Sequence, residues 1–491
     1  MTKSKRPPVK HAGLRMSRLG ARAVVMLCLL GAEGSLYGQK APSVPERSWD
    51  ASSVKQPFKV PARSVPSPVV DPTKIYALSE LVDIAEQNNP ETRVAWENAK
   101  ARAADLGIAQ STLYPTLAAA ALAETHREEI FFGPNFQQQT VATFNPVFVL
   151  DYIIFDFGRR SQQISSSRND LVAADFQFND VHRRVIFQVM QAYYHLLDTT
   201  GQLDAAEANL KNAETVEQAA EDRLQNGLAT LPDLLEARSA TAQADYDLQA
   251  TIGATEIAHG DLATALGISP TTQFQVESLK SIKMPDTISD TVETSIDKAL
   301  SQRPDLMQQV AELRAAEAEV KAERRNYFPT LSIDGSYGLN RSYGTQIHLP
   351  SVYSPTGEYW NATLSLTWTL FDGLARENRL ARAHADQKQA AAGVDSIRDQ
   401  VENQVWSAYS TARTALRQQK AAAALLAAAT ESYNAALESY NYGVRSQIDV
   451  VSAQRTLADA RTADVNARTQ LLTALAALAY QTGDLLYTRH P

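Results

Sequence analysis

The side chains that could carry out chemistry are few and lie far apart along the chain. His182 and His195 fall in one helical segment, but their spacing puts them on different faces of a helix with 3.6 residues per turn. The sequence has no glycine-rich phosphate-binding loop, no zinc-type cluster of His and Glu, and no serine nucleophile elbow. We therefore expect a protein that is not an enzyme and that needs no metal and no cofactor.

Two aspartates at matching positions are the remaining candidates. Asp233 lies six residues after Gly227, and Asp449 lies six residues after Gly443. We expect each carboxylate in the first turn of a helix, where the helix dipole favours a negative charge. Capping a helix is therefore one role for this pair, and a further role depends on which elements bring the two aspartates together.

The matching positions belong to a duplication of a domain-sized unit. Asn89-Pro90 corresponds to Arg303-Pro304 at an offset of 214 residues. Further on, the offset is 216 for the pairs Phe155 and Phe371, Ala192 and Ala408, Gly227 and Gly443, Asp233 and Asp449, and Gly267 and Gly483. A constant offset over separated landmarks indicates that a whole unit was duplicated. We place the first copy at 75–270, a linker at 271–290 and the second copy at 291–486.

Each copy is predicted to contain the same helices in the same order. A short helix comes first, and a second helix begins at Pro90 or Pro304, where proline suits the first turn. The longest segments contain no proline and keep one helical apolar stripe, so each forms a single helix of about 100 Å at 1.5 Å per residue. The expected ranges in the two copies are 76–88 and 292–302, 90–112 and 304–327, 158–226 and 373–441, and 232–266 and 446–480.

Between these helices the apolar period changes from 3.6 to 2, which indicates strands. Two strands of about ten residues are expected in each copy, joined by loops at 126–138 and 341–357. One face of the strands is apolar and the other is rich in serine and threonine, a pattern typical of a transmembrane β-barrel. A soluble sandwich or a sheet covered by helices is the alternative. The expected lipid-facing residues are Phe148, Leu150, Trp360, Leu364, Leu366 and Trp368.

The number of strands requires association. Four strands cannot close a barrel, for which about eight are needed, and an open sheet would leave backbone groups unpaired in lipid. Three copies would supply twelve strands. The expected fold is therefore mainly α with a membrane β-barrel, and the acidic net charge of −8 argues against nucleic acid as a partner.

The N-terminal region has the composition of an export signal followed by a linker. Basic residues precede an apolar run at 23–32, and Ala32, Gly34 or Gly38 could mark the cleavage site, so we assign 1–38 to a signal peptide. The only cysteine, Cys28, lies in that run. A lipid anchor there is the less favoured alternative, because Leu27 before it is not small. Residues 39–74 are rich in proline and are assigned to a linker.

Taken in order, the landmarks resemble those of the TolC-like outer-membrane efflux proteins, the outer membrane factors of tripartite efflux and type I secretion systems. The resemblance covers about residues 75–486 and is carried by Tyr114-Pro115 and Phe328-Pro329, Phe155-Asp156 and Phe371-Asp372, Gly227-Leu228 with Asp233-Leu234-Leu235, and Tyr440-Asn441-Tyr442-Gly443 with Asp449-Val450-Val451. It implies a homotrimer with a twelve-strand β-barrel in the outer membrane of a Gram-negative bacterium and a twelve-helix α-barrel in the periplasm.

The resemblance also implies partners and a gate. A periplasmic adaptor would contact the tips of the helical hairpins, and an inner-membrane pump would supply the solute. Arg445 and Tyr440 would bond Asp233 to hold the periplasmic end closed, and Asp449 would add a ring of carboxylates at the constriction. The tip residues that would face the adaptor are Gly227, Leu228, Gly443 and Val444.

The function that follows from these expectations is a passive exit duct for small molecules or a polypeptide. A periplasmic adaptor or a structural coiled-coil protein is the alternative, because adaptors also contain a long helical hairpin. The duplication and the alternating pattern of residues 360–370 favour the duct.

Overall fold

The computed structural model describes residues 70–132, 135–288, 290–346 and 356–486. These residues belong to one unit of the chain, Ser67–Pro491. The expected export signal at 1–38 and nearly all of the proline-rich segment at 39–74 lie outside the described residues. So do the central parts of the two expected strand loops.

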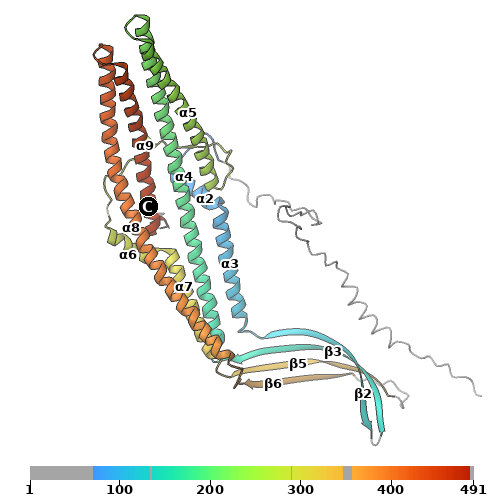
Figure 1. The fold of residues 1–491 in the computed structure, drawn as a ribbon. Coiled ribbons are helices and arrows are strands. Elements are labelled where there is room, and N and C mark those ends of the chain that lie inside the picture. Colours follow the sequence, from blue (N-terminus) through green and yellow to red (C-terminus); the bar gives the residue numbers. More distant parts are fainter. Residues whose placement is uncertain (1–69, 133–134, 289, 347–355, 487–491) are drawn as a thin grey trace, which may run out of the picture. The chain divides into compact units, whose positions relative to one another are not determined.

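The helices occur twice in the expected order (Figure 1). Each copy has a short helix, a second helix of 22 residues, a helix of 67 residues and a return helix of 35 or 36 residues. In the first copy these are α2 Leu78–Asn88, α3 Pro90–Ser111, α4 Arg159–Gln225 and α5 Leu231–Ala265. In the second copy they are α6 Val292–Gln302, α7 Pro304–Arg325, α8 Ala375–Asn441 and α9 Gln447–Thr482.

One expectation near these helices is corrected. The first helix begins at Leu78 and not at residue 76, because Ile75–Tyr76 forms a short strand, β1, parallel to β4 at Gln275–Val276. The segment between the two copies therefore has structure of its own. It contains β4 and a 3-10 turn, η2 Leu279–Ser281, and the Leu279 side chain is buried in the core.

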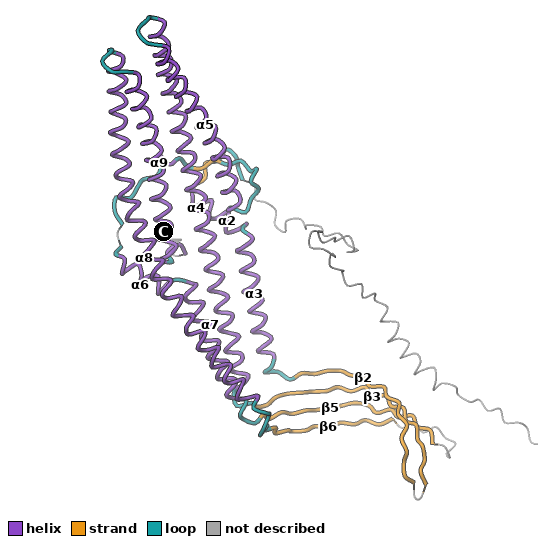
Figure 2. Tube along the Cα trace, in the orientation of Figure 1, coloured by secondary structure: helices purple, strands orange, loops and turns teal. Residues whose placement is uncertain are grey.

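The four long strands form one antiparallel sheet in the order β2-β3-β5-β6 (Figure 2). Their bounds are β2 Thr116–Phe132, β3 Asn135–Phe155, β5 Thr330–Gln346 and β6 Thr356–Thr367. The expected length of about ten residues was too short, and much of both expected loops is strand. Pairing continues because backbone hydrogen bonds do not need an apolar side chain, and Arg127 Nε bonds Thr140 Oγ1 across the hairpin at 2.9 Å.

Within each copy, the long helix packs against the other two helices of its hairpin. α4 contacts α3 and α5, and α8 contacts α7 and α9. The end of α5 meets the start of α3, where Asn89 Nδ2 donates to the Ala265 carbonyl oxygen at 3.4 Å. The second copy repeats this joint, with Arg303 Nη1 donating to the Gln481 carbonyl oxygen. Each hairpin therefore pairs one continuous helix with one interrupted helix.

The expected apolar stripe of the long helices forms the core. Val185 and Val189 of α4 and Val401 and Val405 of α8 are completely buried. Burying such a side chain contributes about 1.5–3 kcal/mol. The stripe was readable in the sequence because it repeats at helical spacing in both copies. None of the helices in the described part of the chain is long and apolar enough to span a membrane.

A buried ionic cluster joins the two copies. Arg183 of α4 is 1% exposed and lies against Asp180, Asp305 and the ring of Tyr480. Burial would raise the pKa of the Asp305 carboxyl, but hydrogen bonds from Arg303 and the charges of Arg303 and Arg183 outweigh it and lower that pKa. The aspartate therefore stays ionised, and replacing Arg183 by a neutral residue would remove a cationic partner from both Asp180 and Asp305.

The joint between α5 and α3 depends on Gly267, which gives a first prediction. Its φ is +73°, and a Cβ there would lie 2.8 Å from the Asn88 carbonyl oxygen. We expect Gly267→Ala to lower the free energy of unfolding by about 2 kcal/mol, because both the left-handed backbone and the contact disfavour a side chain. The measurement is the melting temperature of the purified protein.

The control is Gly253→Ala in the middle of α5, where a Cβ meets nothing within 4 Å. Alanine is more stable than glycine within a helix by about 0.5–1 kcal/mol, so this variant should melt at the wild-type temperature or above it. Equal melting temperatures for the two variants would contradict the assignment of Gly267 to a constrained joint.

Candidate functional site

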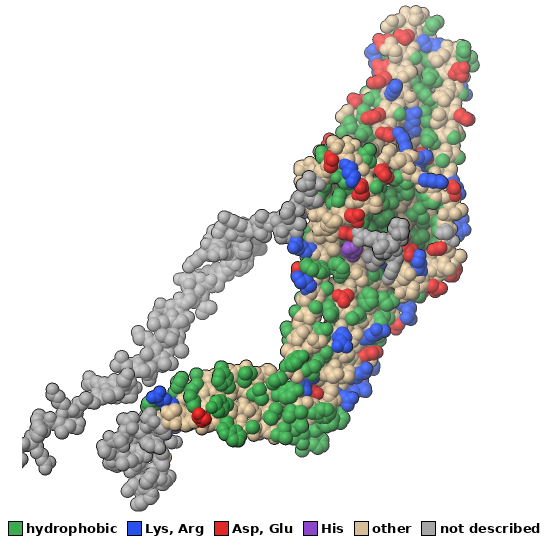
Figure 3. All heavy atoms as spheres, turned by 180° about the vertical axis from the view of Figure 1, so that it is seen from behind, with side chains coloured by type: hydrophobic (Ala, Val, Ile, Leu, Met, Phe, Trp, Pro, Cys, Tyr) green, Lys and Arg blue, Asp and Glu red, His purple; other side chains and the backbone are tan. Residues whose placement is uncertain are grey.

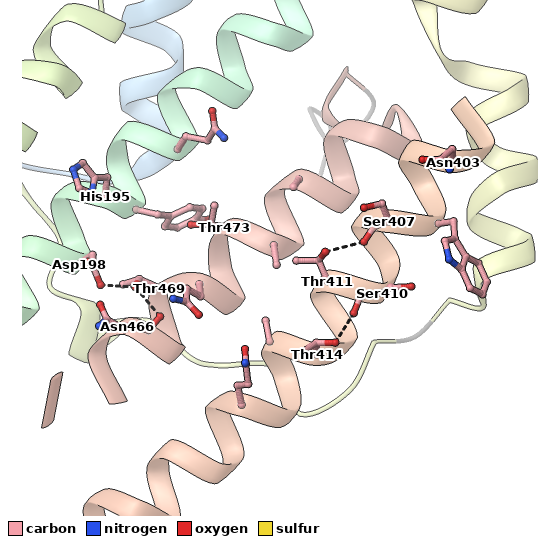
Figure 4. Close-up of a pocket in the computed structure, with 18 residues that line it drawn as sticks. His195, Asp198, Asn403, Ser407, Ser410, Thr411, Thr414, Asn466, Thr469 and Thr473 are labelled. Atoms are coloured by element: carbon pink, nitrogen blue, oxygen red, sulfur yellow. Dashed lines mark hydrogen bonds between the residues drawn. The ribbon is translucent and has the colours of Figure 1, made fainter. Parts of the chain in front are cut away.

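A polar groove runs between three of the long helices (Figure 4). Its volume is about 1000 Å³, and α4, α8 and α9 line it. Most of the lining side chains are small and uncharged, and few of them can titrate. The polar lining residues on α8 and α9 are Asn403, Ser407, Ser410, Thr411, Thr414, Gln418, Asn466, Thr469, Gln470 and Thr473.

The one carboxylate of this groove is already bonded by neutral groups. Asp198 of α4 accepts hydrogen bonds from Thr469 Oγ1 and from Gln202 Nε2, both at 2.7 Å. Gln202 Nε2 also donates to Asn466 Oδ1 at 2.9 Å. The carboxylate therefore links α4 to α9. The described residues contain no group of three or more His, Cys, Asp or Glu side chains that could hold a metal ion.

The polar face continues beyond this groove along α4 and α9. A second cavity of about 260 Å³ is lined by α5, α4 and α9. Its α9 residues, from Val451 to Thr462, continue the stripe that lines the first groove from Asn466 to Ala477. At 1.5 Å per residue the shared stripe is about 40 Å long. The arrangement offers a long, largely polar surface, and the side chains that line it form no catalytic constellation.

The sheet carries the opposite kind of surface on one face. Cross-strand neighbours place Phe148, Tyr337 and Trp360 in one row, and Leu150, Gly335 and Ala362 in the next. Figure 3 shows hydrophobic side chains gathered over the strands, whereas charged side chains lie mostly over the helices. Of the residues expected to face lipid, Phe148, Trp360, Leu364, Leu366 and Trp368 are exposed, and Leu150 is half-buried. Trp368 lies just beyond the end of β6, and its Nε1 donates to the Tyr327 carbonyl oxygen at 3.1 Å.

The far ends of the long helices turn at Gly227 and Gly443 in the same way. Both glycines have positive φ, +69° and +74°. The amide of Leu228 bonds the Arg223 carbonyl, and the amide of Val444 bonds the Ser439 carbonyl, which is the hydrogen bonding of a Schellman motif. Leu228 is 70% exposed and Val444 is 78% exposed. Each tip therefore presents an apolar side chain to the surroundings.

Asp233 and Asp449 lie in the first turns of the return helices, as expected. The Asp233 carboxylate accepts bonds from Thr230 N and Oγ1, and Asp449 accepts the same two bonds from Ser446. These hydrogen bonds lower the pKa of both carboxyls. Among the described ion pairs, Arg445 is not joined to Asp233, so the gate between the hairpins stays a prediction about the assembled protein.

Sequence reasoning missed a residue that links the two hairpins near their tips. Arg223, in the last turn of α4, places its guanidinium carbon 4.3 Å from the centre of the Tyr440 ring and donates to the Tyr440 carbonyl oxygen. Tyr440 is 5% exposed, and burial raises the pKa of its hydroxyl. Arg223 precedes Gly227 by four residues and Tyr440 precedes Gly443 by three, so the shared position in a last helical turn was the available signal.

A duplicated unit of helical hairpins with a four-stranded sheet, an apolar strand face and a polar groove defines the class of outer membrane channels. The model of the family "Outer membrane efflux protein" matches residues 81–268 and 295–484, one match for each copy. The chain belongs to this family. It is an outer membrane channel of efflux systems that extends into the periplasm, and channels of this family are not enzymes.

Similar proteins agree with this assignment. Protein CyaE of Bordetella pertussis is 29% identical over 357 residues, which is 72% of this chain and 73% of that protein. Outer membrane protein OprJ of Pseudomonas aeruginosa is 24% identical over 422 residues, 85% and 86% of the two chains. The crystal structure of a membrane protein from Pseudomonas aeruginosa has the same fold, with a TM-score of 0.73, 23% identity, and coverage of 88% of this chain and 100% of that one. Matches in both copies decide against the adaptor and the coiled-coil alternatives.

The contact between Arg223 and Tyr440 gives a second prediction. A cation–π contact that is partly shielded from water is worth about 1–2 kcal/mol. We expect Arg223→Ala to speed hydrogen–deuterium exchange of the amides around Gly443 by about tenfold, since 1.4 kcal/mol corresponds to a factor of ten. Arg238→Ala is the control, because the ion pairs of Arg238 in the described part of the chain are with glutamates of its own hairpin, Glu217 and Glu221. Equal exchange in the two variants would contradict the link.

Proposed function

We propose that three copies of this chain form one passive exit duct across the outer membrane and the periplasm. The observation that carries the proposal is an open sheet with an exposed apolar face, in the same unit as a polar groove along helices of 67 residues. Family members form trimers within tripartite efflux systems. In a trimer, β6 of one copy would pair with β2 of the next, and twelve strands would close the barrel.

The two faces of the sheet would then face different solvents. We assign the row of Phe148 and Trp360, together with Leu150, Leu364, Leu366 and the neighbouring Trp368, to the lipid side. The opposite face of β5 and β6 carries Ser332, Asp334 and Ser336 beside Ser365, Thr363 and Asn361. Hydroxyl and carboxylate groups of this kind suit a water-filled lumen. The groove along α4 and α9 would continue that lumen through the periplasm.

The tips would be the gate and the docking point. We propose that a periplasmic adaptor, coupled to an inner-membrane pump, contacts the turns at Gly227, Leu228, Gly443 and Val444, whose apolar side chains are exposed. Between hairpins of the trimer, Arg445 and Tyr440 would bond Asp233, since an arginine fork on a carboxylate is strong where water is partly excluded. Asp449 would add one carboxylate per copy at the constriction.

Transport through such a duct would be passive. Lumen-facing serine, threonine and amide groups interact with water about as well as with a solute, so they favour passage over selection. The choice of solute would belong to the pump. Small molecules are the solutes that an efflux channel passes, and a polypeptide would use the same path in a secretion system.

The lipid-facing assignment gives a third prediction. An arginine on the lipid face costs about 2–4 kcal/mol for each copy at mid-membrane and up to about 1 kcal/mol near the ends of the strands. Leu366 is the second-last residue of β6, so a trimer would lose up to about 3 kcal/mol. We expect Leu366→Arg to reduce the yield of trimers extracted from isolated outer membranes several-fold, read as the heat-labile species of three chains on a gel. Ser365→Arg, one residue away on the opposite face, should assemble as the wild type does. Normal assembly of Leu366→Arg would contradict the assignment of Leu366 to the lipid-facing side of the sheet.

The gate gives a fourth prediction. Replacing Arg445 by glutamate would turn an attraction to Asp233 into a repulsion, so we expect Arg445→Glu to raise the single-channel conductance in a planar bilayer. Arg398→Glu is the matched control. It makes the same change of charge on an exposed part of α8, roughly 60 Å from the tip at 1.5 Å per residue. If both variants conduct like the wild type, Arg445 does not hold the gate.

A further inference from the structure

A small pocket rich in arginine lies where the sheet meets the helices. Its volume is about 330 Å³, and the lining residues come from the starts of α4 and α8, the end of α7, and the adjoining ends of β5 and β6. Four guanidinium groups line it, with threonine hydroxyls and one amide beside them. These residues are Arg159, Arg325, Arg376, Arg379, Asn326, Thr330, Thr367 and Thr369.

The carboxylates at this pocket already have cationic partners. Asp156 accepts from Arg160 Nε at 3.0 Å. Asp372 lies 3.3 Å from Arg376 Nε and 3.4 Å from Arg379 Nη2. The third acid nearby, Glu323, accepts from Asn326 Nδ2 at 2.7 Å and lies 3.8 Å from Arg379 Nε. These pairs occupy three of the five arginines of the cluster.

Positive charge remains after this pairing. Five arginines, at 159, 160, 325, 376 and 379, face three acids, at 156, 323 and 372, so the cluster carries 5 − 3 = +2 in a chain whose net charge is −8. Arg159 and Arg325 form no ion pair within the part of the chain that the structure describes. Arg159 Nη1 reaches Asn326 Oδ1 at 3.4 Å, whereas its Nε is shut off from solvent and has no hydrogen-bond partner.

Comparison of the two copies shows that the fold does not need these arginines. The position that matches Arg325 is Ser111, the one that matches Arg379 is Gln163, and the one that matches Arg159 is Ala375. The ion pair at the junction, in contrast, occurs in both copies, as Asp156 with Arg160 and as Asp372 with Arg376. The ion pair therefore serves the junction itself, and the additional arginines need another explanation.

We propose that this pocket binds a phosphate-sized oxyanion, the phosphate, sulfate or carboxylate group of a solute inside the duct. A guanidinium group presents paired N–H donors that match the oxygens of such an anion. Thr330 and Thr367 are cross-strand neighbours on the serine- and threonine-rich face of the sheet, so the anion reaches the pocket from the lumen. This step rests on the proposed duct, and a trimer would hold three such pockets.

Inorganic phosphate is the probe, and the experiment uses the full trimer in a planar bilayer of phosphatidylcholine. We expect millimolar phosphate to reduce the wild-type single-channel current. Arg159→Gln and Arg325→Gln should each weaken the apparent affinity for phosphate by about tenfold, because each removes a charge-assisted contact. Arg325 is exposed, so its replacement leaves the fold intact. Arg382→Gln, the loss of an exposed arginine on α8 outside the pocket, should leave the affinity unchanged.

A thermal measurement in detergent separates this proposal from the duct. Phosphate should raise the melting temperature of the wild type and of Arg382→Gln more than that of the two pocket variants. If the trimers conduct but all variants respond to phosphate in the same way, the proposed binding at the pocket is wrong. The proposed duct is unaffected by that result. If phosphate stabilises the protein but the protein does not conduct, the proposed duct and the route of the anion through its lumen are both wrong.

A lipid headgroup offers the same chemistry from another source. Repeating the current measurement with phosphatidylglycerol in the bilayer distinguishes the two sources. An unchanged affinity for phosphate supports a solute in the lumen. Loss of the phosphate effect in the anionic bilayer only, with the thermal effect in detergent intact, would show that a headgroup occupies the pocket and would overturn the lumenal assignment.

Discussion

An open sheet edge in a membrane is the constraint on which the rest of this structure depends. The edge strands β2 and β6 each have backbone groups on one side that no other strand of the sheet pairs. In hydrocarbon each unpaired group costs several kcal/mol, whereas Trp360 and Leu366 on the sheet are suited to lipid. Both conditions are met together only when copies of the chain complete one another. In the proposed trimer, closure of the sheet would gather the helices into a ring with their polar stripe inside.

The duplication explains how one chain would supply two similar sectors of such a ring. The joint between α5 and α3 and the joint between α9 and α7 use the same hydrogen bond. In each joint, the side chain of the residue before a proline donates to a carbonyl oxygen at the end of the return helix. The side chain that makes it is Asn89 in one copy and Arg303 in the other. Only Arg303 also pairs with Asp305 and so enters the buried cluster around Arg183. The backbone geometry is therefore kept, while the side chains have diverged for different neighbours.

Much of the fold could be predicted because its signals are local and occur twice. The helix bounds follow from proline, glycine and the apolar stripe, and Asp233 and Asp449 were found as first-turn carboxylates because capping involves residues three positions apart. Strand lengths were underestimated, since β2 and β3 stay paired through polar residues such as Arg127 that break the apolar alternation. Arg223 was missed because its partner Tyr440 is 217 residues away, and a shared position in a last helical turn does not by itself show that the two side chains meet.

The magnitudes at the tips would suit the proposed gate, which a partner would open. A contact such as that of Arg223 with Tyr440 is worth about 1–2 kcal/mol, so three copies would supply roughly 3–6 kcal/mol. Moving an equilibrium between a closed and an open state from 1:99 to 99:1 takes about 5.5 kcal/mol. Three contacts of this strength would keep hairpins together in the unbound channel. The exposed Leu228 and Val444 side chains could repay that cost when a partner covers them, because burying each contributes about 1.5–3 kcal/mol in each copy.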